Sequence, residues 1–178
     1  MQATFGKPIL PMPMRSALTI LAAAAALAAP TAAIAVSRSS DDGTLAVRDA
    51  VGRVRIAAVG GFIGRLDKGR VTIVDPVEGD GTGPLVNGCE FKRLVFDPET
   101  GGTTAVCAGA KLRFRLVGGK FNVIIRGSGL DLSVVGHGTV MLDGAGGDDG
   151  RYSFNGADFQ SMPDTSRIFT LAAPSTGP

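Results

Sequence analysis

The chain has 178 residues, which is enough for one well-buried domain and too few for two. Apolar residue types make up 44% of it, so the composition is not that of a disordered acidic chain, and its 2 cysteines are too few for a disulfide-dense mini-protein. The sequence has no Trp, 1 Tyr and 1 His. It therefore lacks most of the side chains that stack on sugars and bases or serve as general bases.

The first 35 residues have the pattern of an N-terminal extension followed by a cleavable signal peptide. One charge, Arg15, precedes an apolar run of 13 residues over 17–29, and the small-x-small triplet Ala33-Ile34-Ala35 follows a proline. This run is shorter than the roughly 17–25 residues that span a bilayer, so we expect no transmembrane segment in the mature chain. We expect export to the extracellular space or cell envelope after cleavage at Ala35, from a start codon at Met1, Met12 or Met14.

Cleavage at Ala35 would change the charge balance. Lys7 and Arg15 would leave with the peptide and no acidic residue would, so the 18 Lys and Arg residues would fall to 16, against 16 Asp and Glu. The mature chain would then be formally neutral. A net positive charge therefore gives no argument for nucleic acid as a partner, and we expect none.

Export also makes the two cysteines, Cys89 and Cys107, candidates for a disulfide. Such a bond would close a short loop and stabilise the fold by about 3 kcal/mol through the unfolded state. Zinc would require more ligands than these two cysteines and one distant histidine supply.

From Thr44 onward the sequence alternates polar and apolar residues in short runs, at 53–56, 70–73 and 111–116. Alternation with a period of two is typical of strands with one buried face. Glycines recur between these runs, and no stretch has a helical apolar stripe of three turns. We therefore predict a single antiparallel β-sandwich or partly open barrel of about ten short strands. Its expected bounds are 44–172, with a flexible lead over 36–43 and a flexible tail over 173–178.

Two segments echo each other. RVRIAAVGG (53–61) and KLRFRLVGG (111–119) share alternating basic and apolar residues followed by Val-Gly-Gly. Glycine adopts a positive φ at low cost, so each double glycine is predicted to be the turn of a hairpin. Two copies are too few to indicate a long solenoid.

The run from Gly109 to Gly144 reads GAKLRFRLVGGKFNVIIRGSGLDLSVVGHGTVMLDG, and DDGRYSFNG and a late Pro163 follow it. Its Arg-Phe-Arg-Leu-x-Gly-Gly and Gly-x-Gly-Leu-Asp-Leu-Ser segments resemble a group of small, uncharacterised exported actinobacterial proteins, over roughly residues 44–171. The resemblance implies an exported β domain and assigns no functional residue.

Catalytic patterns are weak. Ser133, His137 and Asp143 supply the residue types of a nucleophilic triad, but strand alternation over so short a span explains them equally well. We expect His137 to be a residue of a turn with unusual φ. Asp75 and Asp143 could serve as the paired carboxylates of a glycosidase, although aromatic platforms are missing. We expect no catalytic residues and no enzyme activity, with a small secreted hydrolase as the weakest alternative.

The glycine-rich segment 143–150 is a candidate calcium loop, because flexible carboxylates and carbonyls are the ligands that Ca²⁺ prefers. Its carboxylates are Asp143, Asp148 and Asp149. A solvated acidic turn is the simpler interpretation. A calcium-stabilised extracellular module is therefore the alternative function, and no other cofactor is expected.

Basic residues concentrate on the echoed strands. If those strands are neighbours, five side chains would align on one sheet face as an anion-binding stripe, because Arg offers a rigid fork to phosphate or carboxylate. These residues are Arg53, Arg55, Lys111, Arg113 and Arg115. We therefore expect a non-enzymatic domain that binds anionic envelope polymers or another envelope protein.

Overall fold

The computed structural model describes residues 39–77, 79–146 and 149–174. The signal peptide predicted over residues 1–35 lies outside these ranges, and the described residues all belong to one compact unit. No helix within these ranges is long and apolar enough to cross a membrane. The strands are β1 (Gly43–Asp75), β2 (Thr82–Asn87), β3 (Phe91–Phe96), β4 (Thr103–Val117), β5 (Lys120–Gly144), β6 (Arg151–Phe154), β7 (Gln160–Ser161) and β8 (Arg167–Leu171).

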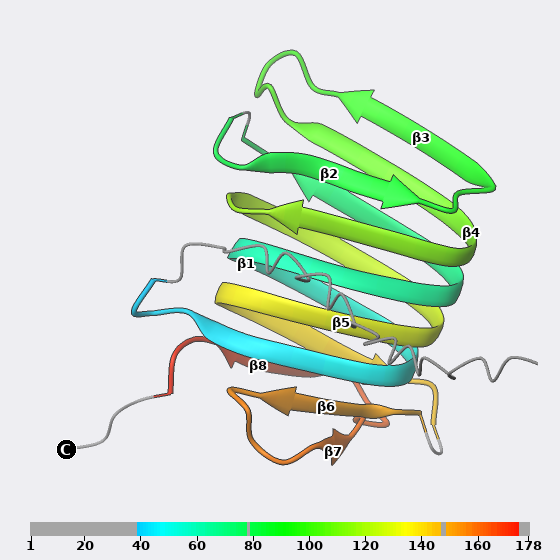
Figure 1. The fold of residues 1–178 in the computed structure, drawn as a ribbon, viewed down its shortest axis with the longest axis vertical. Helices are drawn as coiled ribbons and strands as arrows, with labels where there is room; N and C mark the ends of the chain where they lie inside the picture. The colour runs from blue at the N-terminus through cyan, green and yellow to red at the C-terminus, as the bar shows by residue number, and fades with distance from the viewer. Residues whose placement is uncertain (1–38, 78, 147–148, 175–178) are drawn as a thin grey trace, which may run out of the picture. The chain divides into compact units, whose positions relative to one another are not determined.

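All strand pairs are antiparallel and form one open sheet, so the predicted all-β class is confirmed. The strands are fewer and longer than expected, because β1, β4 and β5 bend and continue where separate strands were predicted. Residues 53–59 of β1 pair with two different segments of β5, 120–126 on one side and 137–143 on the other. The two long strands thus wind together as a coil (Figure 1).

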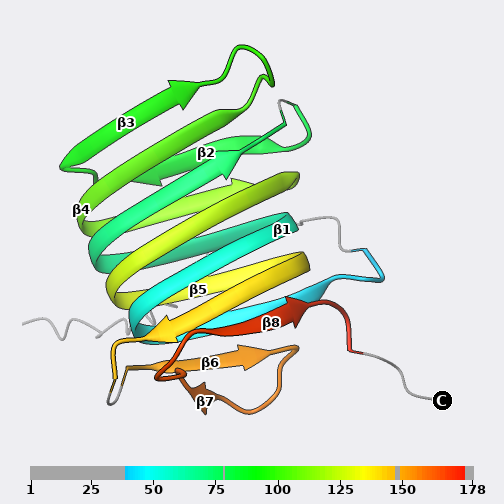
Figure 2. The same cartoon turned by 180° about the vertical axis from the view of Figure 1, so that it is seen from behind.

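The coil forms two facing layers, which we name by the figure in which each faces the viewer. The front layer (Figure 1) consists, in spatial order, of β6, residues 43–50 of β1, 130–136 of β5, 60–66 of β1, 112–117 of β4, and β2. The back layer (Figure 2) consists of β8, 137–144 of β5, 52–59 of β1, 120–127 of β5, 68–75 of β1, 103–110 of β4, and β3.

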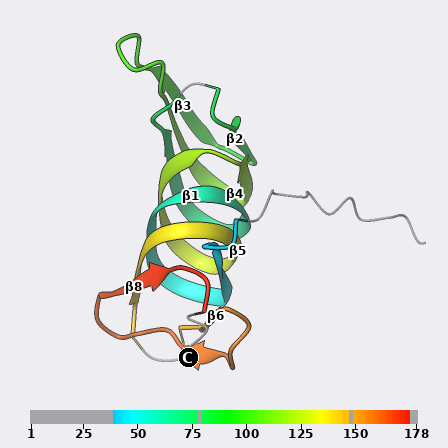
Figure 3. The same ribbon diagram turned by 90° about the vertical axis from the view of Figure 1, so that its left-hand side faces the viewer.

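The long strands bend from one layer to the other (Figure 3), and glycines stand at these bends. Five of them face one another in a continuous row, which we call the glycine seam: Gly109, Gly69, Gly127, Gly52 and Gly144. At Gly69, φ is +151° and a Cβ atom would lie 2.1 Å from the carbonyl oxygen of Arg126. The bend thus requires both a backbone conformation that other residues avoid and space that a side chain would fill.

The strand pairing corrects the hairpin prediction for both echoed segments. β1 runs through Gly60-Gly61 without turning back, since Gly60 also lies at a bend, opposite Gly136. The second double glycine, Gly118-Gly119, connects β4 to β5, but these two strands do not pair with each other, so it is not a hairpin turn either. It carries the chain from residues 112–117 of the front layer to residues 120–127 of the back layer. Glycine can adopt a positive φ at a bend as readily as in a hairpin turn, so the Val-Gly-Gly pattern alone does not indicate a hairpin.

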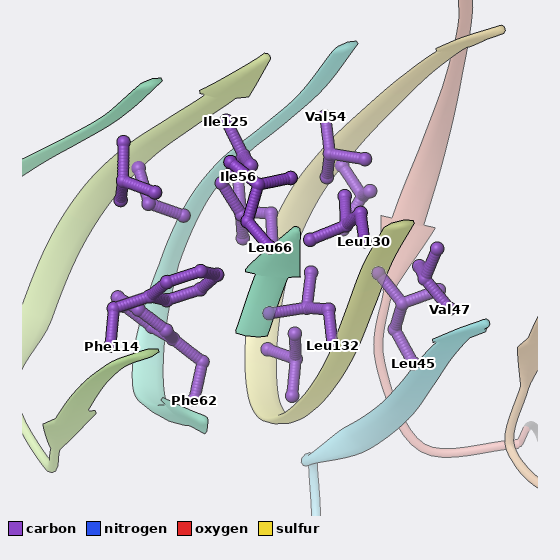
Figure 4. Close-up of a cluster of buried hydrophobic side chains, with 14 of the residues drawn as sticks. Leu45, Val47, Val54, Ile56, Phe62, Leu66, Phe114, Ile125, Leu130 and Leu132 are labelled. Atoms are coloured by element: carbon purple, nitrogen blue, oxygen red, sulfur yellow. The ribbon is translucent and has the colours of Figure 1, made fainter. Parts of the chain in front are cut away.

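The core lies between the layers and follows the alternation in the sequence. Val54 and Ile56 from the back layer and Leu66, Leu132 and Phe114 from the front layer point toward one another (Figure 4). Each is almost completely buried, which contributes about 1.5–3 kcal/mol per large apolar side chain. Phe62 completes an aromatic contact, with its ring centroid 4.7 Å from that of Phe121.

The two ends of the sandwich differ. At the end formed by β6, β7 and β8, the rings of Tyr152, Phe154 and Phe169 pack together, with centroids 5.1–5.8 Å apart. At the opposite end, β2 and β3 are edge strands, and each pairs only with β4 among the described residues. The predicted disulfide is confirmed there, joining Cys89 between β2 and β3 to Cys107 in β4.

Candidate functional site

The outer face of the front layer carries a groove of about 870 Å³. It extends from the first segment of β1 across β5 and the third segment of β1 to β4 and β2. Small side chains, Ala46 and Ser133, occupy its floor on one side, and longer side chains surround them. The residues that define its chemistry are Arg48, Arg65, Arg113, Arg115, Asp131, Ile63 and Leu85.

The strand register explains why these side chains meet. Residues directly opposite each other on neighbouring strands point to the same face of a sheet. One row across the strands contains Ser133, Ile63, Arg115 and Leu85, in that order. The next row contains Asp131, Arg65, Arg113 and Asn87. The alternation that places Leu112, Phe114 and Leu116 in the core therefore places both arginines of β4 in the groove.

One ion pair fixes part of the groove. The Arg65 guanidinium contacts the Asp131 carboxylate at 2.5 Å, and Asp131 also accepts a hydrogen bond from the Asp49 backbone N–H at 3.0 Å. Burial raises the pKa of Asp131, but these hydrogen bonds and the positive charge of Arg65 outweigh it, so the pKa lies below its ordinary value. The hydrogen bond and charge of Asp131 likewise raise the pKa of Arg65. Both groups therefore stay ionised at neutral pH.

The remaining arginines leave the groove positively charged. Arg113 and Arg115 are exposed, and their guanidinium groups form no hydrogen bond or ion pair with other described residues. Being two residues apart on one strand, they stand roughly 6–7 Å from each other. Arg48 lies over the Phe159 ring, 4.3 Å from its centroid. Four guanidinium groups and one carboxylate, that of Asp131, line the groove, while the charges of Asp67 and Asp49 act on Arg65 from nearby.

The structure does not bring the five predicted basic residues together. Arg53 and Arg55 lie on the back layer, whereas Arg113 and Arg115 lie on the front layer. Lys111 lies where β4 passes between the layers, with φ of +54°. The prediction of a single stripe is wrong because it assumed that the echoed strands were neighbours. In fact 53–56 pairs with β5 on both sides.

On the back layer, Arg53 has a local partner. Its Nη2 donates to Oδ2 of Asp143 at 2.6 Å, and Arg126 and Arg70 continue the same row on the next strands. The hydrogen bond from Arg53, followed by that from Ser166, lowers the pKa of Asp143. This basic row lies outside the groove lining.

The candidate calcium residues are only partly described. Asp143 forms an ion pair with Arg53, and Asp149 is buried. Asp148 lies outside the described residues. Within the described ranges, no group of three or more His, Cys, Asp or Glu side chains could hold a metal ion.

The three residues considered as a nucleophilic triad do not lie together. Ser133 lies in the front groove, Asp143 pairs with Arg53 on the back layer, and His137 contacts Oδ1 of the buried Asp42 at 2.8 Å through Nδ1. The prediction that His137 is a turn residue with unusual φ is wrong. His137 lies within the continuous strand β5, and the positive φ values belong to the flanking Gly136 and Gly138. Asp75 and Asp143 lie on back-layer segments that are separated by two others.

The sequence reasoning missed Arg48 and Arg65. A signal for Arg65 exists in the glycine pattern. If Gly69 is aligned with Gly109 on antiparallel strands, Arg65 falls opposite Arg113 and Ile63 opposite Arg115, which is the observed register. No comparable signal indicates Arg48, since a bulge in β1 follows Val47.

Comparison with known proteins adds no further constraint: no protein-family model, curated protein or solved structure matches this chain.

Proposed function

We propose that this protein is a non-enzymatic, exported domain that binds an anionic polymer of the cell envelope in the groove of the front layer. The observation that carries the proposal is the pair of exposed guanidinium groups, Arg113 and Arg115, which have no acidic partner among the described residues. They lie in a hollow rather than on a flat surface, next to Arg65.

The chemistry of the groove favours a chain of phosphates or carboxylates over a single small anion. Charged contacts extend from Arg48 at one side of the groove to Arg115 near the other, so a repeating anion could meet several guanidinium groups in turn. Ile63 and Leu85 are 54% and 44% exposed and offer apolar contacts to the carbon atoms between the charges. The Arg65–Asp131 pair holds one guanidinium in place before any ligand arrives.

The disulfide between Cys89 and Cys107 supports an oxidising compartment for this function. Disulfides of this kind persist in secreted and envelope proteins and are rare in the cytosol. The apolar run and small-x-small triplet of the first 35 residues give the route of export that the proposal requires.

The test compares two double variants that remove the same charge. Arg113→Ser with Arg115→Ser removes the free pair of the groove, whereas Arg70→Ser with Arg126→Ser removes an exposed, directly opposed pair on the back layer. Binding of fluorescent poly(glycerol phosphate) and of polygalacturonate is titrated by anisotropy over a series of salt concentrations. The groove variant should lose tenfold or more in affinity for one of the polymers, and the back-layer variant should stay within about twofold, because screened charges outside the site contribute little.

Equal losses in both variants would show that the polymer responds to overall charge, and a loss confined to the back-layer variant would place the site on the other face. Either result overturns the proposal, as does wild-type protein that binds neither polymer. A third variant, Arg113→Lys with Arg115→Lys, keeps the charge and removes the planar fork. We expect it to lie between the wild type and the serine variant.

A further inference from the structure

β3 is an edge strand that carries two charged residues, Lys92 and Arg93, but neither of the backbone features by which natural edge strands avoid pairing, a proline or a bulge. Its six residues, FKRLVF, are all exposed, and its register with β4 is continuous from Phe91 to Phe96. It contains no proline and no bulge. By contrast, the other edge strand at this end, β2, contains Pro84 and a bulge between Thr82 and Leu85.

The backbone of β3 has free hydrogen-bonding groups at alternate residues. The Asp97 N–H donates to the Gly102 carbonyl at 2.8 Å, and this pair continues the ladder between β3 and β4. Hydrogen-bonded pairs alternate along an antiparallel ladder, so Phe91, Arg93 and Val95 direct their backbone groups toward β4. The N–H and C=O groups of Lys92, Leu94 and Phe96 therefore point to the open edge.

These free groups are self-complementary. In an antiparallel pair of two β3 strands with Leu94 opposite Leu94, Lys92 lies opposite Phe96 of the second copy. All three free residues then meet free residues, and each pair exchanges two hydrogen bonds. Because paired residues point to the same face, the back layers of the two copies would join as one sheet.

Two other registers, each one pair away, would also match free backbone groups, and each is less favourable. With Arg93 opposite Arg93, two guanidinium groups would face each other directly. With Val95 opposite Val95, Lys92 would lie opposite Pro98, which has no N–H to donate. With Leu94 at the centre, Arg93 lies opposite Val95 and diagonal to Asp97 of the second copy, within reach of its carboxylate. Leu94, which is 62% exposed, would then be covered by Leu94 of the second copy, and Phe96, which is 59% exposed, by the alkyl chain of its Lys92.

We propose that the protein forms a symmetric dimer through β3, with Leu94 on the twofold axis. This inference is independent of the groove, which lies on the front layer. The axis is perpendicular to the sheet, so both grooves open toward the same side. If the proposed function holds, one polymer chain could then contact both copies.

The first test is sedimentation velocity of the purified full chain over a wide range of concentrations. The wild type should pass from monomer to dimer as concentration rises. Leu94→Lys would place two ammonium groups face to face on the axis, and should remain monomeric over the whole range. The matched control is Ile168→Lys on β8, also an exposed apolar residue of the back layer, at 76% exposure. It should dimerise like the wild type.

A cross-linking test checks the register. Leu94→Cys places two thiols opposite each other, so mild oxidation should give a covalent dimer in high yield. Lys92→Cys has its counterpart four residue positions away and should give little. A wild type that stays monomeric at every concentration overturns the dimer, and so does a Leu94→Lys variant that still dimerises. Cross-linking through Lys92→Cys that equals that through Leu94→Cys overturns the register.

Discussion

Both ends of the sandwich carry large apolar side chains, but these side chains pack together at one end and are exposed at the other. At the end formed by β6–β8, Tyr152, Phe154 and Phe169 pack on one another, and Leu171 and Met162 are almost fully buried. At the β2–β3 end, Phe91, Leu94 and Phe96 are each more than half exposed. The described residues include a covering segment at the first end, since residues 151–171 fold across it, and none at the second.

This difference shows that exposure at the β2–β3 end follows from the order of the strands rather than from composition. β4 is the last long strand at that end, and the short β2 and β3 extend one layer each. A disulfide holds that end in place of a packed cluster. The two ends should therefore respond to different perturbations.

The largest expected difference comes from removing a leucine at each end. Leu171→Ala should lower the free energy of unfolding by about 3–4 kcal/mol, because it leaves a cavity under the aromatic cluster. Leu94→Ala removes an exposed side chain and should cost less than about 0.5 kcal/mol. Urea denaturation of both variants, at concentrations where the protein is monomeric, measures the contrast. Similar losses at the two sites would contradict it.

Removing the disulfide should have the next largest effect. Replacing Cys89 and Cys107 with Ala opens a loop with a sequence separation of 18, which should cost about 3 kcal/mol through the unfolded state. Hydrogen–deuterium exchange should then rise most in β3 and least in β8. Reduction of the wild type serves as the chemical control. Uniform exchange across both ends would mean that the disulfide does not hold the β2–β3 end in particular.

The smallest expected effect concerns Asp75, where β1 leaves the sheet toward the β2–β3 end. Burial raises the pKa of its carboxyl group, and its Oδ1 has no hydrogen-bond partner among the described residues. A raised folded-state pKa means that the stabilising contribution is present below the unfolded pKa and is lost as pH rises through the folded value. Asp75→Asn should therefore flatten stability between about pH 4 and pH 7, with a gain at pH 7 below about 1 kcal/mol. Urea titrations across that range check the sign, and a loss of stability at pH 7 would refute it.

Local patterns predicted which strand residues face the core. The alternation at 53–56, 70–73 and 111–116 placed Val54, Ile73 and Phe114 there, and the predicted disulfide between Cys89 and Cys107 is present. A bend between layers could not be distinguished from a hairpin turn, because glycine supplies positive φ to both, and Gly60 and Gly118 stand where the chain passes between layers. That distinction depends on which strand lies alongside, and short-range sequence does not contain this information.

The candidate site shows the same limit. Arg113 and Arg115 could be singled out from one strand, but their neighbours come from residues 48, 65 and 131. Those residues meet only through the register between β1, β4 and β5. Arg53 and Arg55 follow the same alternating pattern as the β4 arginines, but they lie on the other layer. The bend at Gly60 separates them from residues 60–66 of β1, which line the groove.

The winding of β1 with β5 sets the order in which this fold can be completed. Residues 43–59 emerge early during synthesis, yet their partners lie between Lys120 and Gly144, so no local hairpin can satisfy them. Pairing at such long sequence separation makes folding slow, because the loop must close before the contacts form. A nascent chain that ends before Gly144 has β1 without its second partner. We therefore expect the two long strands to pair only after most of the chain has been synthesised.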